Sequence, residues 1–97
     1  MTYRYDPIDQ ELAALTRLAG GFSGKRVLEV GCGNGRITRK YADQAVHVDA
    51  IDPNELKIER ALELASTSET HVHYHAVALE DFQPLHDYDL VILSWSL

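Results

Sequence analysis

Glycine alternates with other residues in the segment Gly31-Cys32-Gly33-Asn34-Gly35, and the acidic residue Asp52 follows it later in the chain. Because glycine lacks a Cβ atom and accepts positive φ, this segment can turn sharply and let a bulky ligand lie against the backbone. A carboxylate close to such a turn can accept hydrogen bonds from both hydroxyls of a ribose. The two features together predict a nucleoside site, with Asp52 preferred to Asp49, which lies inside a predicted strand.

The spacing of these glycines differs from the dinucleotide fingerprint G-x-G-x-x-G, which would need a glycine where this chain has Arg36. This difference argues against a pyrophosphate cofactor and so disfavours a nicotinamide-dependent oxidoreductase. A lone glycine-rich segment is also compatible with a plain structural turn. The combination of a strand, a three-glycine turn, a helix, a second strand and a terminal acid is a much stronger signal.

Hydrophobic patterning predicts the elements that must position these residues. Helices are expected over about 7–19, 35–43 and 54–65, and strands over 26–30, 45–51, 71–77 and 88–93. Strands separated by helical segments favour parallel pairing with right-handed crossovers, and apolar strands suit a sheet that is covered on both faces. The predicted fold class is therefore α/β, with a doubly wound parallel sheet.

Composition excludes several classes of function. The 97 residues include nine Lys or Arg against fifteen Asp or Glu, which gives a net charge of −6, and one cysteine. A net acidic chain without a basic cluster is not expected to bind nucleic acid directly. One cysteine cannot form an internal disulfide, and no apolar run is long enough for a membrane span or a signal peptide. We expect a cytoplasmic protein that does not insert into membranes.

Residues 27–35 resemble the first motif of the class I S-adenosylmethionine-dependent methyltransferases, with Glu29 as the acidic residue two places before the first glycine. Three later segments, 50–61, 79–82 and 88–97, resemble the second, third and fourth motifs of that family. The resemblance spans about 26–97 and implies S-adenosylmethionine as the cofactor. It also implies a Rossmann-like sheet in which the first four strands have the order 3-2-1-4.

The resemblance assigns cofactor contacts to a set of residues from all four motifs. They are Glu29, Gly31, Cys32, Gly33, Asn34, Gly35, Asp52, Pro53, Leu79, Glu80, Ser94 and Trp95. In this assignment the glycine segment approaches the methionine part of the cofactor, and Glu29 organises that segment or holds the amino group. Asp52 would hold the ribose, and Pro53 would pack against the adenine.

The remaining assigned residues would surround the adenine and the methyl group. Leu79 and Glu80 would lie along the adenine edge, while Ser94 and Trp95 would end the fourth strand near the methyl donor. The family often has Asp just before the adenine-edge residue, where this chain has Ala78, so Glu80 or the neighbouring Asp81 would have to recognise the exocyclic amine.

Three histidines, His71, His73 and His75, fall on one face of the predicted strand 71–77, about 6.6 Å apart in successive steps. Two imidazoles at this spacing could share a metal ion, which keeps a metal site open as an alternative. The resemblance places this strand at a sheet edge remote from the cofactor turn, where polar side chains discourage edge pairing. We therefore predict a solvated edge and no metal site.

The resulting hypothesis is transfer of a methyl group from S-adenosylmethionine to a small molecule. No catalytic residue is identified, and Cys32 is interpreted as a small turn residue because nothing in the sequence indicates a lowered thiol pKa. The alternative from another class is a non-catalytic module that binds S-adenosylmethionine or S-adenosylhomocysteine, or that mediates interactions.

The resemblance covers only the cofactor-binding half of a seven-stranded methyltransferase domain. Residues 1–24 would form an N-terminal helix and loop, and 25–97 a truncated core, so 1–97 is predicted to be a portion of one domain. The fourth strand, which contains Leu90-Val91-Ile92-Leu93, would then be an apolar edge. We expect either a fragment of a longer enzyme or self-association through this edge.

Overall fold

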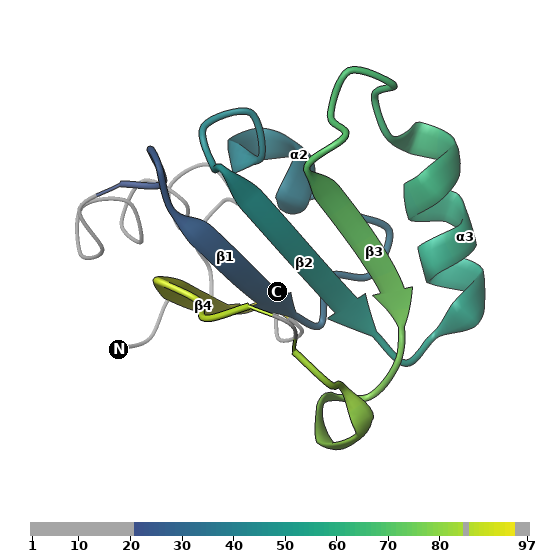
Figure 1. Cartoon of the computed structure of the whole chain (residues 1–97). Coiled ribbons are helices and arrows are strands. Elements are labelled where there is room, and N and C mark those ends of the chain that lie inside the picture. Colours follow the sequence, from purple (N-terminus) through teal and green to yellow (C-terminus); the bar gives the residue numbers. More distant parts are fainter. Residues whose placement is uncertain (1–20, 85, 95–97) are drawn as a thin grey trace, which may run out of the picture.

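The computed structural model of the chain describes residues 21–84 and 86–94 (Figure 1). The expected helix over 7–19 and Trp95 lie outside the described residues. The described elements, in chain order, are β1 (Arg26–Val30), α2 (Thr38–Tyr41), β2 (His47–Asp52), α3 (Glu55–Leu64), β3 (Val72–Ala76), the 3₁₀ turn η1 (Leu79–Asp81) and β4 (Leu90–Leu93). The strands form one sheet in the order β3-β2-β1-β4. All three pairings are parallel, which confirms the expected α/β class and strand order.

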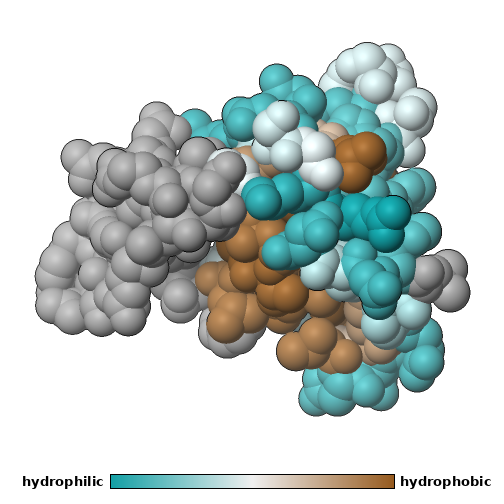
Figure 2. Space-filling model, turned by 60° about the vertical axis from the view of Figure 1, so that its left-hand side comes forward, coloured by the Kyte–Doolittle hydropathy of each residue, from teal (hydrophilic) through white to brown (hydrophobic). Residues whose placement is uncertain are grey.

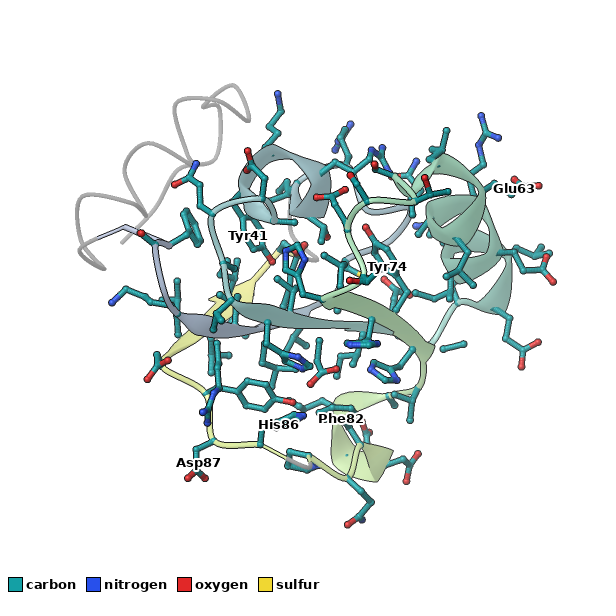
Figure 3. The ribbon with its side chains drawn as sticks, turned by 45° about the horizontal axis from the view of Figure 1, so that its top comes forward. Tyr41, Glu63, Tyr74, Phe82, His86 and Asp87 are labelled. Atoms are coloured by element: carbon teal, nitrogen blue, oxygen red, sulfur yellow. The ribbon has the colours of Figure 1, made fainter. Side chains whose placement is uncertain are left out.

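The two described α-helices lie on the same face of this sheet (Figure 3). Their buried residues pack on Val27, Val48 and Ile92 from the three adjacent strands, and they form the larger hydrophobic core. Phe22 and Tyr41 stack within it, with ring centroids 4.5 Å apart. This core fixes the strands below α2 and α3, so the turns at the carboxyl ends of β1 and β2 have a rigid base.

The opposite face of the sheet carries a smaller core. It consists of Leu28, Val30 and Ile51, against which Val77, Phe82 and Tyr88 pack. These three partners come from the segment that joins β3 to β4, so this segment covers part of the second face. Figure 3 shows Phe82 and His86 on this side of the sheet and Tyr41 and Tyr74 on the other.

The helix after the glycine turn is shorter than expected. The sequence predicts it over 35–43, whereas α2 spans Thr38–Tyr41. Gly35 has φ +82°, which is incompatible with a right-handed helix, so the helix cannot begin there. At the other end, Gln44 N donates to Tyr41 O and Ala45 N to Ala42 O, so the chain tightens into three-residue turns that end the helix.

The helix predicted over 54–65 agrees closely with α3. Asn54 caps it, and its side chain accepts a hydrogen bond from the backbone N of Lys57 at 3.1 Å. Apolar residues at helical spacing predict one apolar stripe, made of Ile58, Ala61, Leu62 and Ala65. Ile58 and Ala61 are the buried residues of α3, as this stripe predicts. Leu62, assigned to the same stripe, is instead 58% exposed, so the buried face of α3 is narrower than the pattern indicates.

The sheet ends in β4, which pairs with β1 and has no other strand neighbour among the described residues. Val91 and Leu93 face the second side of the sheet and are 54% and 57% exposed. Figure 2, in which the left-hand side of Figure 1 with β4 comes forward, shows a patch of apolar surface on that side of the molecule. The expected pairing of this edge with another strand stays a prediction. None of the described helices is long and apolar enough to cross a membrane.

Candidate functional site

The three-glycine turn directly follows β1 and is anchored to the end of β2. The backbone N atoms of Gly31 and Cys32 both donate to Ile51 O, at 2.8 and 3.1 Å. The glycines of this turn all have positive φ, and Gly35 also lacks room for a side chain. A Cβ atom there would lie 2.7 Å from the hydroxyl oxygen of Tyr74 and 3.1 Å from Arg39 Nη1. The positive φ and the close approach of the Tyr74 side chain therefore both favour glycine at position 35.

Asp52 lies at the carboxyl end of β2, next to this turn. Its Oδ2 accepts a hydrogen bond from Gly33 N at 3.0 Å, and its Oδ1 accepts one from Asn54 N at 2.9 Å. The two backbone donors hold the carboxylate in one orientation, and each oxygen keeps a further lone pair for a ligand. The structure therefore brings together the acid and the glycine turn that the sequence singled out.

Glu29 is fully buried beneath the turn, where three hydroxyl groups donate to its carboxylate. Thr38 and Tyr41 both bond to Oε1 at 2.7 Å, and Ser94 bonds to Oε2 at 2.8 Å. Burial, and then the nearby Glu29 carboxylate, raise the pKa of Tyr41 well above its usual value, so this hydroxyl remains a donor. Ser94 Oγ also lies 3.1 Å from Gly31 O. Glu29 thus connects β1, α2 and the end of β4 to the turn.

A polar cavity of about 330 Å³ opens at this turn. Its lining residues are Glu29, Gly31, Cys32, Gly33, Asn34, Arg36, Ile37, Asp52, Lys57 and Ser94. Two acidic residues, Glu29 and Asp52, and two basic residues, Arg36 and Lys57, are thus among the residues that line one space. Neither cation was placed at this site by the sequence. Arg36 entered the sequence argument only as the residue that stands where the dinucleotide fingerprint needs a glycine. Lys57 has the position of an ordinary polar residue beside the apolar stripe of a helix.

A second, mainly apolar cavity of about 430 Å³ adjoins the first across the end of the sheet. It is lined by Val30, Gly31, Ile51, Asp52, Pro53, Val77, Ala78, Leu79 and Glu80. Gly31 and Asp52 line both cavities, so the two spaces meet at the glycine turn and the strand-end acid. A ligand lying across this edge would place a charged part in one cavity and a flat apolar part in the other. Cavities of several hundred cubic ångströms are typical of small-molecule sites.

Most of the residues assigned by the resemblance line one of these two cavities. Gly35 lines neither cavity and is a buried residue of the turn itself. Trp95 lies outside the described residues. Asp49, the competing acid, lines neither cavity and faces the second side of the sheet.

Cys32 is a buried residue of the turn. Burial raises the pKa of its thiol far above its usual value, and the Glu29 and Asp52 carboxylates raise it further. A thiol that keeps its proton is a poor nucleophile. The environment of Cys32 is therefore that of a small turn residue, as the sequence analysis interprets it.

Comparison with known proteins relates this chain to methyltransferases. The family model described as "Methyltransferase domain" matches residues 27–97. Among curated proteins, the ubiquinone biosynthesis O-methyltransferase of Pasteurella multocida is 33% identical over 82 residues, which cover 80% of this chain and 34% of that protein. The protein of the same name from Xylella fastidiosa is 44% identical over 61 residues, which cover 61% of this chain and 24% of that protein. The chain thus spans about a third or less of these relatives.

Solved structures agree with this result. The N-methyltransferase NodS from Bradyrhizobium japonicum, in complex with S-adenosylhomocysteine, superposes with a TM-score of 0.72 at 27% identity, covering 90% of this chain and 45% of that one. An S-adenosylmethionine-dependent methyltransferase from Mesorhizobium loti gives a TM-score of 0.74 at 25% identity, covering 90% of this chain and 41% of that one.

Proposed function

Because the chain belongs to the methyltransferase domain family, we propose that it forms the cofactor-binding part of an S-adenosylmethionine-dependent methyltransferase acting on a small molecule. The observation that carries this proposal is the pair of adjoining cavities that meet at Gly31 and Asp52. One is polar and carries both signs of charge, and the other is mainly apolar. The cofactor has the same division between an amino-acid tail and an adenine ring, with a ribose between them.

The residues present fit each part of that cofactor. The polar cavity offers the carboxylates of Glu29 and Asp52 and the cations of Arg36 and Lys57 to a tail that carries both an ammonium and a carboxylate group. Asp52 is held by two backbone donors at the boundary between the cavities, which suits it to accept from the ribose hydroxyls. The cation contacts of Arg36 and Lys57 add to those implied by the resemblance.

The apolar cavity suits the adenine. Pro53 and Leu79 offer apolar surface, while Glu80 supplies a carboxylate at the rim. The side chain of Ala78 has no polar atom, so we assign recognition of the exocyclic amine to Glu80 or to backbone groups of this segment.

S-adenosylmethionine supplies an activated methyl group on a sulfonium centre, so the main task of the protein is to align the two reactants. The described residues build the cofactor side of this arrangement, in which Ser94 reaches the polar cavity from the end of β4. We propose an oxygen atom of a small molecule as the acceptor, because the curated relatives cited above are named O-methyltransferases. We assign no catalytic residue to the chain. We also place the protein in the cytoplasm and, given its net charge of −6, expect no direct nucleic-acid binding.

The direct test is calorimetric titration of the folded protein with S-adenosylmethionine and S-adenosylhomocysteine. We expect both to bind, and we expect Asp52→Ala to weaken binding of each by at least about tenfold, since a hydrogen-bonded ligand group loses its partner. Asp43→Asn, an exposed acid outside both cavities, is the matched control and should bind as the parent does. Binding of neither compound at millimolar concentration would overturn the proposal.

The alternative function, a module that binds the cofactor without methyl transfer, predicts the same titration result. The two functions are separated by incubating the protein with radiolabelled S-adenosylmethionine and phenolic acceptors. Labelled product supports the enzyme. Cofactor binding without any product supports the module when the measured mass of the native protein is that of these 97 residues.

A further inference from the structure

Four of the five histidines of the chain gather around one buried carboxylate, that of Asp49, on the second face of the sheet. His47 Nε2 lies 2.9 Å from Asp49 Oδ2, and His75 Nε2 lies 2.8 Å from Oδ1. The His47 ring has its centroid 4.4 Å from that of His86 and 5.1 Å from that of His73. The Tyr88 hydroxyl also donates to Asp49 Oδ2.

This histidine cluster (His47, Asp49, His73, His75 and His86) surrounds a cavity of its own. The cavity has a volume of about 190 Å³ and is also lined by Phe82 and Gln83. It shares no residue with either cavity at the glycine turn. The cluster is therefore not explained by the proposed cofactor site.

We propose that His47, Asp49 and His86 bind a divalent transition-metal ion of the zinc type. Each of the three offers one ligand atom, and these atoms lie within 4.8 Å of one another. Imidazole nitrogen and carboxylate oxygen together suit Zn²⁺, Ni²⁺ or Cu²⁺ rather than Mg²⁺ or Ca²⁺, which prefer oxygen ligands alone. Water completes the coordination on the exposed side, where His86 reaches solvent.

The surroundings of Asp49 support a ligand role. With Oδ2 on the metal, Oδ1 keeps its hydrogen bond to His75, and such outer partners orient ligating groups in known metal sites. The Tyr88 hydroxyl also donates to Asp49, so two side chains that are not proposed ligands hold this carboxylate at the cavity.

The three proposed ligands come from two separate parts of the chain. His47 and Asp49 alternate along β2, whereas His86 lies in the segment between η1 and β4. From the sequence alone, only the row His71, His73 and His75 suggests a metal site, and for that row we predict none. In the structure that row is divided, because His71 Nε2 lies 2.6 Å from Ala42 O while His73 and His75 join the histidine cluster. A bound ion would link the segment between η1 and β4, through His86, to His47 and Asp49 of β2.

The test uses the full chain with any affinity tag removed, because a histidine tag would itself bind metal. After treatment with a chelator, the protein is titrated with Zn²⁺ by calorimetry, and its metal content is measured by mass spectrometry after dialysis. We expect one ion per chain at micromolar concentration. Co²⁺ in place of Zn²⁺ should give visible absorption bands without a thiolate charge-transfer band, because Cys32 is not a ligand.

Two histidine variants make the test specific. His86→Ala removes an exposed side chain, so the fold should persist, and we expect the Zn²⁺ affinity to fall by at least about tenfold. His71→Ala is the matched control and should keep the parent affinity. Less than one ion per chain in the parent, or equal affinity for the parent and His86→Ala, would overturn the proposal. Titration with S-adenosylhomocysteine, run on the same samples, reports the cofactor site separately.

Discussion

Replacement of Glu29 tests whether its three hydroxyl partners hold the glycine turn in place. In Glu29→Leu, the hydroxyls of Thr38, Tyr41 and Ser94 all lose the acceptor that they share. A buried hydrogen bond to a charged group contributes roughly 1.5–3 kcal/mol, and Ser94 can turn to Gly31 O instead. We therefore expect the free energy of unfolding to fall by about 4 kcal/mol.

Glu29→Gln is the matched variant, and the geometry predicts a much smaller effect. The amide oxygen can take the place of Oε1 and still accept from Thr38 and Tyr41. The amide nitrogen can then donate to Ser94 Oγ, and the Ser94 hydroxyl can turn to donate to Gly31 O, which lies 3.1 Å from Oγ. Only the assistance of the negative charge is lost, so we expect a loss of about 1 kcal/mol.

The assay is urea unfolding followed by far-ultraviolet circular dichroism, with the slope of each transition compared among the parent and both variants. Equal slopes show that the midpoints report stability. Two results would refute the reasoning. One is an equal loss in the two variants, and the other is a loss below about 1 kcal/mol in Glu29→Leu, less than a single such bond contributes.

Three further predictions concern backbone geometry and titration. Gly35→Ala should lower the free energy of unfolding more than Gly24→Ala does in urea unfolding. Both glycines have positive φ, but only a Cβ atom at 35 would meet another atom, the Tyr74 hydroxyl oxygen at 2.7 Å. Equal losses would mean that φ alone sets the cost of adding a side chain. Hydrogen bonds from Tyr88, His75 and His47 lower the folded-state pKa of Asp49, so its stabilisation is present above the unfolded pKa near 4 and is lost as pH falls through the folded pKa. Asp49→Asn should therefore make the free energy of unfolding less dependent on pH in this acid range. An unchanged pH dependence would contradict the three hydrogen bonds. Burial raises the pKa of Tyr74 to about 12, so the free energy of unfolding should fall as pH rises from about 10, the unfolded pKa, to about 12. Tyr74→Phe should remove this contribution. Tyrosinate absorbance should then show one phenol fewer that ionises only at high pH.

The sheet and the strand-end acid could be predicted from the sequence because both depend on local patterns. Apolar runs bounded by glycine and proline located β1 and β2, and general rules for parallel connections predicted their parallel pairing. The strand order came from the resemblance to the methyltransferases and not from those rules. The length of α2 could not be predicted in this way. The residues after Gly35 have ordinary helix propensity, and the tight approach of Tyr74 to the turn is a tertiary contact.

The cations at the polar cavity show a second limit of sequence reasoning. Lys57 lies in the first turn of α3, where its charge is typical of any exposed helix face. It lines the cavity because the turn between β2 and α3 directs the start of the helix toward the glycine turn. The direction in which α3 leaves β2 cannot be predicted from a single sequence. The spacing that places Asp52 at the end of a strand can.

The histidine cluster had a sequence signal of a different kind, which lies in β2. An internal strand of a parallel sheet is normally covered on both faces and is apolar throughout. β2 has β1 on one side and β3 on the other, yet His47 and Asp49 alternate with Val48 and Ala50. Because alternate side chains point to opposite faces, one face of this strand is core and the other is polar along half its length. Polar residues at every second position of an internal strand therefore indicate a face on which polar side chains take the place of apolar packing. In this protein the polar side chains that contact His47 and Asp49 on that face include His75, His86 and Tyr88.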